Sequence, residues 1–171
     1  MRKFPPKLQI PGLNQTGLME YLAAQPDIIA VYLFGSSASG ETRPDSDIDL
    51  AILLDQTSRS GDESDILARF DREMTLTGSM ETFVHGRKLD VLFLDAAPIQ
   101  LRFQVLSTGF LLYENESRRL DRIEFEVTTV KRYFDLKPLL DFSRRMLLLD
   151  IQEGRFGERR RHHQRTLTAI G

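Results

Sequence analysis

The chain has 171 residues, with 23 lysine and arginine residues, 25 aspartate and glutamate residues and no cysteine. That length suits one domain with a short addition, and a formal charge of -2 does not predict a surface built for nucleic acid or an anionic membrane. The lack of cysteine excludes disulfides, thiolate zinc sites and thiol nucleophiles, so a metal would need oxygen or imidazole ligands. No apolar run approaches the roughly 18 residues of a membrane span, and the first residues lack a signal sequence, so we expect a cytoplasmic protein with no membrane contact.

The first third of the chain predicts one helix and two buried strands. Three prolines within the first twelve residues favour an extended lead-in without regular pairing. A helical spacing of apolar residues follows, with Asn14 or Thr16 as a possible N-cap and Pro26 as its end. The run IIAVYLF, residues 28–34, is continuously apolar and β-branched, which predicts a strand buried on both faces. A polar stretch with room for a short helix separates it from a second apolar strand over 47–54.

The middle of the chain predicts alternating helices and strands. Apolar spacing indicates a helix over 62–78, and KLDVLFLD, residues 88–95, is typical of a strand. Pro98 introduces a helix over 99–106, and FLLYE predicts a short edge strand. This order of elements predicts an α+β fold, a small mixed sheet with helices packed on it.

After Glu116 the sequence becomes helical throughout. Apolar residues recur at steps of three and four from Leu120 to Phe134, and the rhythm resumes beyond Pro138, which we expect to kink or split the helix. We interpret its apolar stripe as core packing first, and as a surface for a partner protein second. The basic residues 159–165 are typical of a solvated tail, so no direct nucleic-acid partner is predicted. The expected organisation is a core over 14–115, a helical extension over 116–157, and flexible ends over 1–13 and 158–171.

Three aspartates form the most informative pattern in the chain. Side chains alternate across a strand, so Asp47 and Asp49 share one face of the second strand. Asp90 interrupts the third strand and joins the same face if the two strands pair. Neighbouring carboxylates repel unless a cation lies between them, and Mg²⁺ prefers oxygen ligands completed by substrate phosphates. The sequence therefore predicts a Mg²⁺ site formed by these three acids, whereas Asp55, Asp95 and Asp121 are interpreted as solvated ends of elements.

A glycine-serine pair precedes the acids by ten residues. Gly35 directly follows a buried strand and allows close backbone approach, and Ser36 adds a hydroxyl group where free N–H groups can face an anion. Together with the acids, the pair would hold a nucleoside triphosphate with its α-phosphorus beside the metal, for in-line displacement at phosphorus. Either half alone is weak, since Asp-x-Asp and Gly-Ser are each common in turns. The spacing, with all three acids on predicted strands, carries the prediction.

Gly35-Ser36, ten residues, Asp47-x-Asp49 and a later Asp90 resemble the nucleotidyltransferase superfamily related to DNA polymerase β. The surrounding segments, LFGSSASGETRPDSDIDLAILLD and KLDVLFLDAAPIQLRFQVLSTGFLLYE, resemble the minimal nucleotidyltransferase (MNT) antitoxins that are paired with HEPN toxins, over about residues 16–135. The resemblance implies a polymerase-β-like fold, ATP and Mg²⁺, and transfer of AMP to a tyrosine of a cognate HEPN ribonuclease within a complex of the two proteins. It implies that the Gly-Ser pair holds phosphates, that the first two acids coordinate Mg²⁺ and that the third orients or deprotonates the acceptor hydroxyl.

The sequence departs from the family pattern at one position. The family commonly has Ala-Arg-Gly after Gly-Ser-x, whereas this chain has Ser39 in place of the arginine. A serine cannot supply the planar fork of donors of a guanidinium, so Arg43 in the same loop is counted as a candidate nucleotide-binding residue. Two other functions stay open. One is an antitoxin of weak catalytic activity that neutralises its toxin by binding, and the other is a small-molecule nucleotidyltransferase of the aminoglycoside type.

Overall fold

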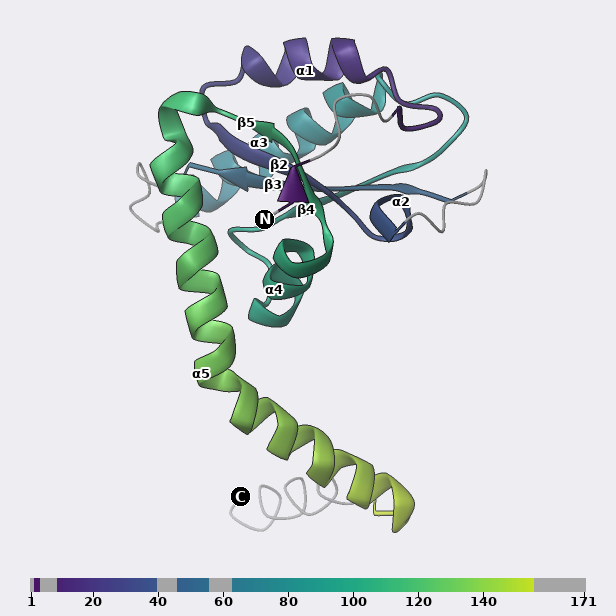
Figure 1. The fold of residues 1–171 in the computed structure, drawn as a ribbon, viewed down its shortest axis with the longest axis vertical. Helices are drawn as coiled ribbons and strands as arrows, with labels where there is room; N and C mark the ends of the chain where they lie inside the picture. Colours follow the sequence, from purple (N-terminus) through teal and green to yellow (C-terminus); the bar gives the residue numbers. More distant parts are fainter. Residues whose placement is uncertain (1, 4–8, 40–45, 56–62, 156–171) are drawn as a thin grey trace, which may run out of the picture. The chain divides into compact units, whose positions relative to one another are not determined.

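The computed structural model describes residues 2–3, 9–39, 46–55 and 63–155. From the first helix to the strand FLLYE the predicted order of helices and strands is confirmed, with ends shifted by a few residues (Figure 1). The elements are β1 (Arg2–Lys3), α1 (Gln15–Ala23), β2 (Ile28–Phe34), α2 (Ser36–Ser39), β3 (Ile48–Leu54), α3 (Glu63–Glu81), β4 (Leu89–Phe93), α4 (Ile99–Thr108), β5 (Phe110–Glu114), a 3-10 turn (Glu116–Arg118) and α5 (Arg119–Gln152).

The strands form one mixed sheet in the order β1-β5-β2-β3-β4. Strand β2 pairs antiparallel with β3 on one side and with β5 on the other. Strands β3 and β4 pair in parallel, with α3 as their crossover connection, and β1 pairs in parallel with β5. The predicted α+β fold with a small mixed sheet is therefore confirmed.

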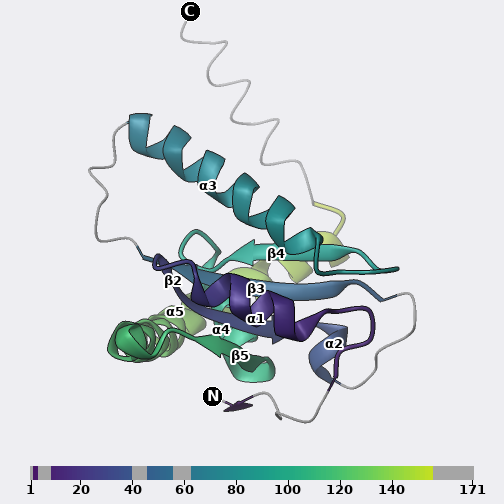
Figure 2. The ribbon, with the colours of Figure 1, turned by 90° about the horizontal axis from the view of Figure 1, so that it is seen from above.

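Helices cover both faces of the sheet, which explains why its central strands are apolar at almost every position. One apolar cluster joins alternate residues of β2 and β3 to Leu18 and Leu22 of α1 and to Leu76 and Met80 of α3. The other cluster joins the intervening strand residues to α4 and to Phe125 of α5. Figure 1 shows α1 and α4 on opposite sides of the sheet, and Figure 2 shows α2 and the first turn of α3 at opposite ends of it.

Two predictions about the edge of the sheet are wrong. The lead-in was expected to lack regular pairing, yet β1 pairs with β5 and Ile10 is buried. Because β1 lies outside β5, β5 is not an edge strand, and its antiparallel partner is β2. Prolines outside the paired residues do not prevent a two-residue pairing, since only the N–H groups of the paired residues enter the ladder.

Helix α5 continues through Pro138, so of the two predicted outcomes, a kink or a split, the split is wrong and the kink stays a prediction. Proline removes one hydrogen bond to the preceding turn, a loss that a solvent-exposed turn tolerates because water can bind the released carbonyl.

The chain divides into two compact units, 1–130 and 131–171. The predicted boundary at residue 116 stays a prediction. No helix among the described residues is long and apolar enough to cross a bilayer.

Candidate active site

The glycine that ends β2 lies against one of the predicted acids. Gly35 has a φ of +67°, in the left-handed region that favours glycine, and α2 begins at the next residue. A Cβ atom placed on Gly35 would lie 2.1 Å from Oδ2 of Asp49. The carboxylate of Asp49 therefore packs against the backbone of the Gly-Ser turn, and a side chain at residue 35 would occupy its position.

Strand pairing brings two of the acids together. In the parallel pairing of β3 with β4, Asp49 is the partner of Asp90, so their side chains project from the same face of the sheet. Ile48 and Leu50 project from the other face into the core, where both are completely buried. Asp47, two residues before Asp49, is exposed, as is Asp90, whereas Asp49 is half-buried.

The electrostatics indicate that the three carboxylates lie close enough to interact. Burial raises the pKa of Asp49 above its ordinary value, and the charges of Asp90 and Asp47 raise this pKa further. The nearby guanidinium of Arg87 lowers it. Such mutual repulsion favours a cation between the acids.

These oxygen donors fit Mg²⁺, which proteins usually hold by one or two carboxylates together with water and substrate phosphates. Within the described part of the chain, no three acids or histidines are already arranged as a complete metal site. The assignment of Asp47, Asp49 and Asp90 as ligands of Mg²⁺ stays a prediction.

Arg87, which the sequence analysis did not single out, is bound at this end of the sheet. Its Nη2 donates to the backbone oxygen of Asp47 at 3.1 Å and to Oγ of Ser37 at 3.2 Å, and its Nε donates to the backbone oxygen of Ser46. Its Nη1 donates to the backbone oxygen of Pro11 at 2.9 Å. The only sequence signal for Arg87 is its position three residues before Asp90. The hydrogen-bond acceptors of its guanidinium lie far away along the chain.

The remaining predicted nucleotide-binding residues are placed only in part. Ser36 is the first residue of α2, directly after the Gly35 turn. Ser39 is the last residue of that helix, and Arg43 lies outside the described residues. Their predicted roles toward a nucleotide stay predictions.

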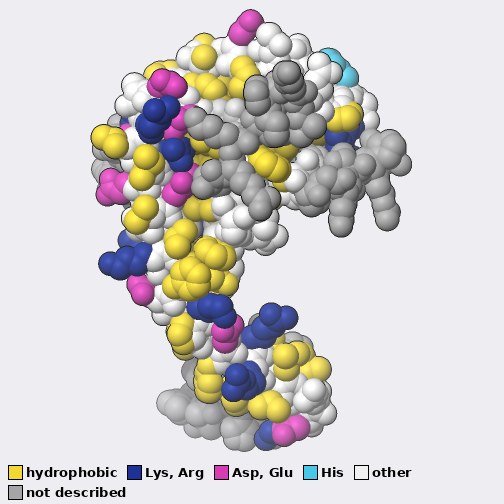
Figure 3. Space-filling view, viewed as in Figure 1, with side chains coloured by type: hydrophobic (Ala, Val, Ile, Leu, Met, Phe, Trp, Pro, Cys, Tyr) yellow, Lys and Arg dark blue, Asp and Glu magenta, His cyan; other side chains and the backbone are white. Residues whose placement is uncertain are grey.

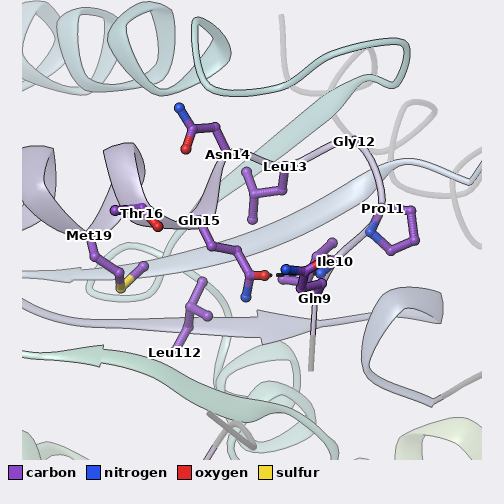
Figure 4. A pocket seen from close by; sticks show the side chains of 10 residues that line it. All are labelled: Gln9, Ile10, Pro11, Gly12, Leu13, Asn14, Gln15, Thr16, Met19 and Leu112. Carbon is purple, nitrogen blue, oxygen red and sulfur yellow. Dashed lines mark hydrogen bonds between the residues drawn. The ribbon is translucent and has the colours of Figure 1, made fainter. Parts of the chain in front are cut away.

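A pocket of about 880 Å³ lies beside α1 and the segment before it (Figure 4). Pro11, which accepts a hydrogen bond from Arg87, is one of its lining residues, and the backbone N–H of Ile10 donates to Oε1 of Gln15 across it. None of the three predicted acids lines this pocket.

The prediction for one of the other acidic residues is wrong. Asp95, predicted as a solvated end of a strand, has a fully buried side chain that forms an ion pair with Arg69 of α3 at 2.9 Å. Asp55 and Asp121 both pair with Arg118. The partners of Asp95 and Asp55 lie far away along the chain, so the local sequence could not reveal them, whereas Arg118 precedes Asp121 by only three residues.

The family model for the polymerase beta nucleotidyltransferases matches residues 17–118, more than half of the chain. The chain belongs to this family. The match includes every predicted site residue, from Gly35 to Asp90, and ends just before α5. A search of curated proteins finds no match.

Individual chains from solved toxin-antitoxin structures are similar to this chain. A chain from a toxin-antitoxin crystal structure with AMP-PNP is 26% identical, with a TM-score of 0.55, and the match covers 82% of this chain and 99% of that one. A chain from a mutant form of the MntA toxin-antitoxin complex is also 26% identical, with a TM-score of 0.53 and coverage of 82% and 98%. A chain from a tri-AMPylated Shewanella oneidensis HEPN toxin in complex with MNT antitoxin is 24% identical, with a TM-score of 0.50 and coverage of 81% and 96%.

Proposed function

We propose that this nucleotidyltransferase is an antitoxin that transfers AMP from ATP to a hydroxyl group of a HEPN ribonuclease toxin, with tyrosine as the acceptor. The observation that carries the proposal is the pairing of Asp49 with Asp90 on adjacent strands, beside the left-handed turn at Gly35. The similar chains come from toxin-antitoxin structures, one with AMP-PNP and one with an AMPylated HEPN toxin, which supports an adenine nucleotide and a HEPN toxin as the acceptor protein.

In the proposed reaction the acceptor oxygen attacks the α-phosphorus of ATP. A bond forms between that oxygen and phosphorus, the bond from the α-phosphorus to the bridging oxygen breaks, and pyrophosphate leaves. Asp90 is a suitable acceptor for the proton of the attacking hydroxyl, because it is exposed beside Asp49 on the same face. Mg²⁺, held by Asp47 and Asp49, would neutralise charge on the phosphates. The backbone at Gly35 and Ser36 would hold the phosphate oxygens.

Labelling with ATP that carries ³²P on the α-phosphate tests this proposal. Purified protein, Mg²⁺ and a cognate HEPN protein should yield a labelled HEPN protein, and Asp47→Asn should abolish the label. Glu20→Gln is a matched control, since Glu20 is an exposed acid on α1 away from the site, and it should label as the wild type does. Label that survives in Asp47→Asn would overturn the proposed metal role.

A second candidate function, neutralisation by binding alone, is favoured by the surface of α5. The helix exposes large apolar side chains among its charged ones, including Leu139 and Phe142, which are 61% and 60% exposed (Figure 3). Such side chains suit contact with another protein. Asp47→Asn separates the candidates: a variant that transfers no AMP and still inhibits the ribonuclease fully would establish binding as the mechanism.

A further inference from the structure

We propose that Arg87 is a positioning residue that holds the triphosphate-binding turn and the metal-binding strand at a fixed separation. This inference rests on the proposed function, because it concerns how the same site is assembled. Arg87 lies in the segment before β4, yet its guanidinium bonds to residues on both sides of the stretch 40–45, which links α2 to β3.

The contacts of Arg87 define a clasp with four acceptors. On one side of the stretch 40–45 it binds Oγ of Ser37 in α2, and on the other it binds the backbone oxygens of Ser46 and Asp47. Oγ of Ser37 itself donates to the backbone oxygen of Asp47 at 3.2 Å, which closes the clasp. The fourth acceptor is the backbone oxygen of Pro11. A planar guanidinium can serve several acceptors at once in fixed directions, which the ammonium of a lysine cannot do.

Gly12 shows that the fold makes room for this side chain. It has a φ of +79°, and a Cβ atom there would lie 3.0 Å from Cδ of Arg87 and 2.7 Å from the backbone oxygen of His85. The backbone N–H of His85 donates to the oxygen of Gly12 at 2.7 Å, and Pro11 accepts from Arg87. The segment before α1 therefore packs directly against the arginine and limits its movement.

The clasp matters for function because its ends carry the site. Ser37 follows the Gly35-Ser36 turn, and Asp47 is a predicted Mg²⁺ ligand, so the arginine connects the two halves of the motif. The charge of Arg87 also acts on Asp49. Misplacement of a catalytic group by about 1 Å can reduce a rate by about 100-fold, so a fixed separation of these halves has a direct effect on catalysis.

The test compares Arg87→Gln and Arg87→Lys with Arg102→Gln. Arg102 is a matched control because its guanidinium also donates to backbone oxygens, those of Ala97 and Asp95, at the turn after β4. Thermal unfolding gives the structural contribution of each arginine. Affinity for ATP with Mg²⁺, by calorimetry, and for Mn²⁺ with AMP-PNP, by electron paramagnetic resonance, gives the contribution to the site.

We expect both Arg87 variants to bind ATP and Mn²⁺ at least tenfold more weakly than the wild type, and Arg102→Gln to change only the melting temperature. Ser37→Ala, which removes one acceptor of the clasp, should also weaken binding, by a smaller factor than the Arg87 variants do. If Arg87→Gln does not fold, Ser37→Ala takes its place in the test. Wild-type affinity for ATP and Mn²⁺ in Arg87→Gln would refute the inference. If Ser37→Ala has replaced that variant, wild-type affinity in Ser37→Ala would refute it. Wild-type affinity in Arg87→Lys would also refute it, since charge alone would then suffice.

The same measurements separate this inference from the proposed function. If the wild type binds ATP with Mg²⁺ but labels no HEPN protein, the proposed acceptor is wrong, and the affinities of the Arg87 variants still decide the role of the clasp. If the wild type labels its partner and the Arg87 variants bind normally, the inference alone fails. A wild type that binds neither ATP nor Mn²⁺ would refute both.

Discussion

Substitution of Gly35 by alanine tests whether the turn after β2 shapes the site or only connects two elements. The φ of +67° at this residue lies where an L-residue other than glycine is strained, at a cost of about 1–2 kcal/mol. For a chain of this size that strain lowers the melting temperature by about 2–8 °C. This loss would follow from backbone conformation alone.

The new Cβ atom has a second effect, which the distances to Asp49 determine. It would lie 2.1 Å from Oδ2 and 2.8 Å from Cγ of that carboxylate, whereas ordinary contact begins at 3.4 Å. The carboxylate would therefore have to move by more than about 1 Å, a displacement that can reduce a catalytic rate by about 100-fold. We expect Gly35→Ala to reduce AMP transfer by at least that factor at a temperature where the variant is fully folded.

Gly86→Ala separates strain from displacement. Gly86 has a similar φ of +69°, but no atom lies within 4 Å of its Cβ position. It should lose a similar amount of stability and keep its transfer rate, measured with labelled ATP under the same conditions. If Gly35→Ala transfers AMP as fast as Gly86→Ala, Asp49 does not need the position that the structure gives it, and the assignment of the site is wrong.

The charged groups of the chain lead to three more predictions. Asp49→Asn relieves repulsion among the three acids, so without metal its melting temperature should equal or exceed that of the wild type. The variant should also lose AMP transfer. A lower melting temperature in EDTA would contradict this prediction. Burial alone would raise the pKa of Glu114, but hydrogen bonds from two arginines of α5 outweigh burial and hold this pKa below 4.5. The contribution of ionised Glu114 to stability is therefore complete above pH 4.5 and is lost as the pH falls through the lower native pKa. The melting temperature of Glu114→Gln should therefore depend less on pH below 4.5 than that of the wild type. Tyr32→Phe removes the hydrogen bond that the hydroxyl donates to Glu126 at 3.0 Å and should cost about 1–2 kcal/mol in urea unfolding, whereas no change would mean that Arg122 alone satisfies that carboxylate.

The sequence predicts the elements of this fold well because local patterns determine them. Continuous apolar runs indicated β2 and β3, and a cap and a proline bounded α1, since these signals act within a few residues. Contacts between distant segments left no such signal. Arg87 meets Pro11 from 76 positions away, and Asp95 is buried only because Arg69 of another helix reaches it.

The position of the acids was predictable for a reason that lies in the core. Asp49 and Asp90 each lie between two apolar residues of their strands, and the apolar neighbours pair with one another, Ile48 with Leu89 and Leu50 with Val91. A slip of one residue between β3 and β4 would turn Leu89 and Val91 out of the core and Asp90 into it. The apolar residues therefore fix the register, and the register places both carboxylates on one face.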